Sequence, residues 1–171
     1  MKKFGIVVVL GLALAGCGQK NASASSASSK PKTVITTKQY TTAQLQKRYV
    51  KIVDAVVTPL DLASYSKSTA TIKQAVTKGK RQIANVQLQL ADNNGQPKLN
   101  QALKQLSQAA TTMLTAMVGK DQAAYNTAAK AFMSQTNAIA KTYYNGSIPQ
   151  KLSVYSQRMA NKAGSSTDSA N

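Results

Sequence analysis

The chain has 171 residues, with 22 Lys and Arg against 5 acidic residues and a formal net charge of +17. All five acidic residues are Asp, and the sequence contains no His and no Glu. This composition lacks the usual general base near neutral pH and the commonest metal ligand, so we expect no enzyme, no metal and no other cofactor.

The first residues have the layout of an export signal. Residues 1–3 supply positive charge, and residues 4–15 are apolar. An apolar stretch of 12 residues is too short to cross a membrane, which takes about 20. We therefore interpret residues 1–16 as a signal peptide.

The stretch Leu14-Ala15-Gly16-Cys17 contains the only cysteine of the chain. It resembles the lipobox of bacterial lipoproteins, in which an aliphatic residue and two small residues precede a cysteine. The resemblance implies cleavage between Gly16 and Cys17 and transfer of a diacylglyceryl group, with palmitate-type chains, to the Cys17 sulfur. Two or more acyl chains anchor a protein stably. We therefore expect a protein held on the extracytoplasmic face of the cell membrane, and we favour a Gram-positive source.

Three regions follow the signal peptide. Residues 17–40 are predicted to be a flexible tether that starts at the lipidated cysteine, because their Ser- and Ala-rich part has little to bury. As a flexible coil this tether spans about 25–28 Å. Residues 41–162 carry the pattern of a folded domain, and residues 163–171 are small and polar and are expected to fray. Removal of residues 1–16 leaves a chain of 155 residues with a net charge of +15.

The folded domain is predicted to begin with a helix over 42–64. Thr41 and Gln44 have the spacing of a capping box. Pro59 lies inside the apolar pattern, so we expect a kink or a break just before it and a turn near residues 65–69. The apolar positions recur at spacings of three and four, which indicates a helix with one buried face: Leu45, Tyr49, Ile52, Val53, Val56, Val57, Leu60 and Ala63.

Three further long helices are predicted over 69–90, 98–118 and 121–143, and a shorter one opens at Ile148-Pro149. Each long helix would span about 32–35 Å. Near-equal amphipathic helices joined by short turns are typical of helix bundles. The predicted fold is all-α: an antiparallel up-down-up-down four-helix bundle with a short additional C-terminal helix.

Two groups of side chains could carry chemistry beyond packing. Asp54 and Asp61 lie two helical turns apart on one face, but two carboxylates with no other ligand are a poor ion site, and we do not predict one. Tyrosines next to Lys and Arg could stack on sugars or bases. We instead expect the four on apolar faces to lie in the core with a solvated hydroxyl: Tyr49, Tyr65, Tyr125 and Tyr155.

Two modest clusters of basic residues are the candidate anion-binding residues: Lys47, Arg48 and Lys51 in the first helix, and Lys78, Lys80 and Arg81 in the second. The positive charge predicts attraction to polyanions such as teichoic acid or anionic lipid headgroups. We do not expect nucleic acid as the partner. The alternative is that the charge only solvates the surface, since Lys residues occur in every predicted helix.

These features lead to a non-enzymatic, membrane-anchored lipoprotein whose basic helical domain binds an anionic partner of the cell envelope, either a cell-wall polymer or lipid headgroups. An alternative is a protein-interaction or exclusion module that blocks a channel, a phage component or a secreted factor. A small-ligand carrier is a third possibility, and a sizeable pocket in the bundle would favour it.

Overall fold

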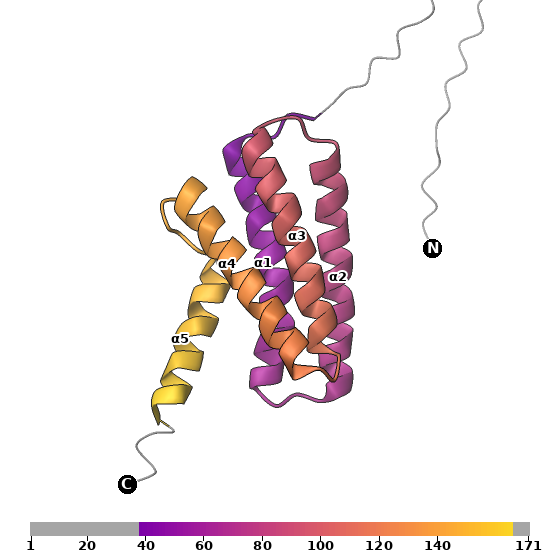
Figure 1. The fold of residues 1–171 in the computed structure, drawn as a ribbon, viewed down its shortest axis with the longest axis vertical. Coiled ribbons are helices and arrows are strands. Elements are labelled where there is room, and N and C mark those ends of the chain that lie inside the picture. The colour runs from indigo at the N-terminus through magenta and orange to yellow at the C-terminus, as the bar shows by residue number, and fades with distance from the viewer. Residues whose placement is uncertain (1–37, 166–171) are drawn as a thin grey trace, which may run out of the picture. The chain divides into compact units, whose positions relative to one another are not determined.

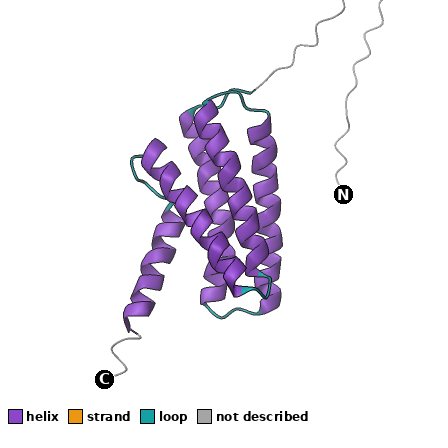
Figure 2. Cartoon of the chain, viewed as in Figure 1, coloured by secondary structure: helices purple, strands orange, loops and turns teal. Residues whose placement is uncertain are grey.

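The computed structural model describes residues 38–165, which form five helices (Figures 1 and 2). The helices are α1 (Thr42–Ser64), α2 (Thr69–Ala91), α3 (Pro97–Met117), α4 (Gln122–Tyr143) and α5 (Gln150–Ser165). Within the described residues no strand forms. The prediction of an all-α fold is confirmed, and the four long helices begin and end within one residue of the expected positions.

The helices alternate in direction along the chain, as an up-down bundle requires (Figure 1). α1 packs against both α2 and α3, and α4 packs along α3 while crossing the other helices obliquely. The C-terminal half of α4 reaches α1, where the Tyr49 hydroxyl donates a hydrogen bond to the Thr136 carbonyl at 3.0 Å. The rings of Tyr49 and Tyr144 stack there with centroids 5.3 Å apart. α5 lies beside α1 and runs parallel to it.

α1 begins with the predicted capping box. The Thr41 hydroxyl accepts from the Gln44 N–H, and the Gln44 side chain accepts from the Thr41 N–H, which satisfies two free donors of the first turn. α1 then continues through Pro59 without a break and ends at Ser64. The Thr58 hydroxyl does not cap a new helix but donates back to the Asp54 carbonyl at 2.7 Å.

The turn between α2 and α3 is built around Asn93, which is buried. Its Oδ1 accepts from the N–H groups of Tyr40 and Gly95, and Lys38 forms a parallel bridge with Asn93. A Cβ on Gly95 would lie 2.7 Å from the Tyr40 carbonyl oxygen, so this close approach requires glycine. Residues 38–40, at the end of the predicted tether, are therefore held against this turn.

The core is formed by the apolar faces of all five helices. The predicted face of α1 is buried except at Ala63, which is exposed. The largest fully buried side chains come from all five helices and include Tyr49, Ile52, Ile83, Leu90, Leu103, Leu114, Phe132 and Leu152. Burial of a side chain of this size contributes about 1.5–3 kcal/mol to folding.

Candidate functional site

A polar groove of about 360 Å³ lies between α1, α2 and α5. We call it the α1–α2–α5 groove. Three charged side chains line it, one from each helix, together with an amide, a hydroxyl and small residues: Asp54, Ala55, Thr58, Ala75, Lys78, Gly79, Gln82 and Lys151.

One proline and one glycine meet at the Ala55 carbonyl, beside the groove. Pro59 has no N–H to donate to the Ala55 carbonyl, which lies one turn earlier in α1. Gly79 of α2 packs directly against that carbonyl: a Cβ at Gly79 would lie 2.6 Å from the Ala55 oxygen and 3.1 Å from Leu114 Cδ1 of α3. α1 and α2 therefore approach each other closely at this point.

Asp54 is the only acidic residue among those that line the groove. Burial raises the pKa of its carboxyl, and the nearby Lys151 ammonium opposes that effect. Oδ1 of Asp54 is shielded from solvent and has no hydrogen-bond partner among the described residues. Lys151 Nζ does not pair with it but donates to Thr58 Oγ1 at 2.7 Å. An acceptor and a cation thus face the same groove without satisfying each other.

The structure brings part of the predicted basic set to this face. Lys78 is exposed and lines both the groove and a shallow hollow on α2, of about 460 Å³, that Lys73 and Arg81 also line. Lys51 is exposed at the seam between α1 and α2, where the Gln82 side chain donates to its carbonyl at 3.4 Å. We call Lys51, Lys73, Lys78, Arg81 and Lys151 the basic face.

The other three predicted basic residues have different surroundings. Lys47 is exposed but lines neither hollow. Lys80 is half-buried and also lines neither. The Arg48 guanidinium stacks on the Tyr40 ring, 3.6 Å from its centroid, and donates to the Gln44 carbonyl at 2.8 Å. Arg48 thus contributes to the fold around the start of α1.

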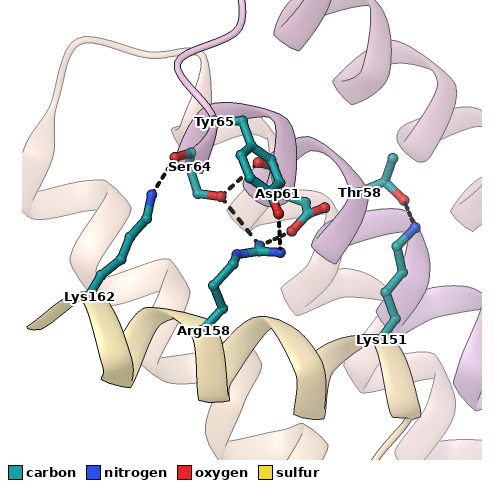
Figure 3. Close-up of polar contacts among 7 residues, drawn as sticks. All are labelled: Thr58, Asp61, Ser64, Tyr65, Lys151, Arg158 and Lys162. Carbon is teal, nitrogen blue, oxygen red and sulfur yellow. Dashed lines mark hydrogen bonds and ion pairs between the residues drawn. The ribbon is translucent and has the colours of Figure 1, made fainter.

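α5 is attached to the end of α1 by a row of polar contacts (Figure 3). Arg158 forms an ion pair with Asp61 and a hydrogen bond to the Tyr65 hydroxyl at 2.9 Å. Lys162 Nζ donates to the Ser64 carbonyl at 2.9 Å. The last turn of α1 contains no basic residue of its own. α5 therefore supplies the positive charge that favours the C-terminal end of a helix.

The tyrosines only partly match the expectation. Tyr49 is buried, and Tyr125 and Tyr155 are half-buried against the core. Tyr65 is 54% exposed, so its expected core position was wrong. It lies just after α1 ends, where the helical period no longer places it inward, and the Arg158 guanidinium covers its ring at 4.6 Å from the centroid. Sequence spacing gave no signal for that contact, because the two residues are 93 positions apart.

A third hollow, of about 390 Å³, lies at the end of the bundle where α3 leads into α4. We call it the apolar pocket. Burial raises the pKa of Tyr125 and of Tyr155, and neither hydroxyl has a hydrogen bond to another described residue. The walls of the apolar pocket are mostly apolar, although Lys120 and Asp121 also line it. The lining residues are Leu60, Ala63, Ser64, Ile72, Ala116, Met117, Gly119, Lys120, Asp121, Gln122, Tyr125, Tyr155 and Met159.

Gly16 and Cys17, where we predict cleavage and lipidation, lie outside the described residues. Within residues 38–165 no three His, Cys, Asp or Glu side chains gather in a way that could hold a metal ion. Asp61, considered above as a partner of Asp54, is paired with Arg158 instead. Over the same residues no helix combines the length and hydropathy needed to cross a membrane.

Comparison of the chain with models of protein families, with curated proteins and with solved structures found no match. The fold, the α1–α2–α5 groove and the apolar pocket therefore define the class of protein: an all-α helical bundle with a basic polar groove on one side and an apolar pocket at one end.

Proposed function

We propose that this chain is a lipid-anchored, non-enzymatic protein of the extracytoplasmic membrane surface whose helical domain binds an anionic partner of the cell envelope. The observation that carries the proposal is the basic face, where cations of α2 and α5 line one groove and one adjoining hollow and Lys51 of α1 lies at the α1–α2 seam. The described residues include 17 Lys and Arg against 4 Asp, so the attraction is reinforced by a surplus of 13 positive charges.

The anchor part of the proposal rests on the lipobox-like stretch that ends at Cys17. Replacing Cys17 by Ala removes the only sulfur that could accept a diacylglyceryl group. The full chain carrying Cys17→Ala should leave the membrane fraction while the bundle keeps the circular dichroism spectrum of a helical protein. Retention of the variant on the membrane would contradict the anchor.

The binding part is tested by titration of the full chain, in neutral detergent, with teichoic acid and with vesicles that contain anionic lipid. Binding should weaken steeply as the ionic strength rises, because exposed charges are screened beyond about 8–10 Å at physiological salt. An affinity that does not change with salt would refute the electrostatic mechanism.

A pair of matched double variants distinguishes binding at the basic face from attraction by the overall positive charge of the protein. Lys78→Ala with Arg81→Ala removes two cations of the basic face, whereas Lys130→Ala with Lys141→Ala removes two exposed cations of α4. Both lower the net charge equally. The first pair should weaken binding more than the second; equal losses would show that the charge is dispersed and that the groove is not the site.

The apolar pocket supports a second candidate function, the carriage of a small amphipathic ligand. Its volume falls within the 300–1,000 Å³ typical of ligand sites, and its two tyrosine hydroxyls form no hydrogen bond to another residue of 38–165. Ala63→Leu should fill part of the pocket, and Ala123→Leu on the exposed surface of α4 is the control. An environment-sensitive apolar dye whose fluorescence rises with wild type and with the control, but not with Ala63→Leu, would support this function.

A further inference from the structure

The α1–α2–α5 groove is an unusual site for simple polyanion binding, because a carboxylate lines it beside two lysines. Asp54 is half-buried and lines the groove together with Lys78 and Lys151. Its Oδ1 is shielded from solvent, and the carboxylate has no hydrogen-bond partner among residues 38–165. A phosphate held by the two lysines would approach this carboxylate and be repelled by it. The repulsion disappears if the ligand places a hydrogen-bond donor between its phosphate and Asp54.

We propose that the α1–α2–α5 groove selects phosphate groups that carry a neighbouring hydroxyl, as in a glycerol phosphate, with Lys78 and Lys151 holding the phosphate and Asp54 accepting from the hydroxyl. This inference rests on the proposed binding of an anionic envelope partner and names its chemistry. A carboxylate oxygen accepts a hydroxyl proton in a strong, charge-assisted hydrogen bond. Phosphate oxygens accept from the lysine ammonium groups in the same way.

The state of the neighbouring groups supports this division of roles. Lys151 lies close enough to Asp54 to oppose the effect of burial on that carboxyl, yet it donates to Thr58 Oγ1 and forms no ion pair with Asp54. The groove therefore holds the Lys151 cation and the Asp54 acceptor apart. A ligand that carries both a phosphate and a hydroxyl can bind one group to each. Gly79 forms part of the groove wall, and a side chain at this position would clash with the backbone of α1.

The same chemistry occurs in a glycerol phosphate polymer and in a phospholipid with a glycerol headgroup. The test uses the full chain in neutral detergent and three probes: a glycerol phosphate polymer, the same polymer with its hydroxyls methylated, and vesicles whose anionic lipid has either a glycerol or a methyl headgroup. The two polymers have equal charge and spacing, so only the donor differs. Preference for the glycerol vesicles over the methyl vesicles, with an affinity above that for the hydroxylated polymer, identifies the lipid as the source. A higher affinity for the hydroxylated polymer than for the glycerol vesicles identifies the polymer.

Wild type should bind the hydroxylated polymer about tenfold more tightly than the methylated polymer, the size expected for one hydrogen bond to a charged group. Asp54→Ala should abolish that ratio and leave binding of the methylated polymer equal or tighter, because a repelling charge is gone. Asp92→Ala removes the same charge from the exposed C-cap of α2 and should preserve the ratio. Asp54→Asn, which keeps a neutral acceptor oxygen and the side-chain shape, should give an intermediate ratio.

A salt-sensitive wild type that binds both polymers equally would overturn the selection by hydroxyl and leave the proposed function standing. A ratio that survives in Asp54→Ala would likewise overturn it, because the hydroxyl would then be recognised elsewhere. Failure of wild type to bind either polymer or any anionic vesicle would overturn the proposed function itself.

Discussion

The contact between Gly79 and the Ala55 carbonyl gives the sharpest test of how α1 and α2 pack. An added Cβ would lie 2.6 Å from a backbone oxygen that cannot rotate away, and Leu114 Cδ1 closes the other side at 3.1 Å. In Gly79→Ala the two helices must therefore separate. Overpacking of this kind costs about 1–3 kcal/mol, and the backbone clash places this site in the upper part of that range.

Helix propensity acts in the opposite direction. In a helix interior Ala is about 1 kcal/mol more favourable than Gly, so the same substitution at an open position would stabilise the protein. The difference between the two effects is a net loss of about 1–2 kcal/mol in the free energy of unfolding. For a domain of this size that loss lowers Tm by about 3–8 °C.

The assay is urea unfolding followed by far-UV circular dichroism, with Ala84→Gly as the control. Ala84 is exposed on the same helix, so its replacement reports propensity alone and should cost about 1 kcal/mol. If Gly79→Ala raises stability by the amount that Ala84→Gly lowers it, the position is open and the close approach of α1 and α2 is refuted.

Three other predictions concern buried polar groups. Tyr49→Phe should lower the free energy of unfolding by about 1 kcal/mol, because the hydroxyl donates to the Thr136 carbonyl inside the core; unchanged urea unfolding would contradict this. Asn93→Ala should speed amide hydrogen exchange at Tyr40, whose N–H it binds, while the protection of the helices persists; slow exchange in the variant would show that another contact holds the segment. Burial raises the pKa of Asp54, so the folded state binds the extra proton and stability should rise as the pH falls from neutral toward about 4; Asp54→Asn should lack that part of the rise in melting experiments.

The periodicity of apolar residues was enough to predict the helices and most of the core. Spacings of three and four recur over more than 20 residues in each long segment, so the burial of one face dominates any local preference. That spacing also includes Gly79, which is three residues after Val76 and four before Ile83 and is buried in α2. It could not show why glycine is needed there, because the reason is the Ala55 carbonyl on another helix.

Of the kink and the break that were the two expectations at Pro59, the break does not occur. A proline inside a helix removes one hydrogen bond and crowds the preceding turn, which by itself favours a break. Burial of Val56, Val57 and Leu60 on both sides of Pro59 holds α1 together across the defect. Packing of the apolar face thus outweighs the loss of one backbone hydrogen bond.

The groove was not predictable from the sequence. Lys151 reaches Thr58 across 93 positions of the chain, and Arg158 reaches Asp61 across 97. No periodicity within a single helix encodes such pairs, because they depend on how α5 returns along α1. Basic residues at 78 and 81 were recognised as a cluster, but their relation to Asp54 arises only from the packing of three helices.

The way α5 is attached has a consequence for any polyanion that binds. Leu152 is the one fully buried side chain among residues 150–163 of α5, and cations of α5 donate hydrogen bonds to α1 and to Tyr65 just after it. Such contacts weaken as salt rises. A ligand that binds Lys151 in place of Thr58 removes one of the contacts that attach α5 to the bundle. The measured binding free energy would then include the free energy needed to detach α5 partly from α1. The attachment of α5 would depend on both the ligand concentration and the ionic strength.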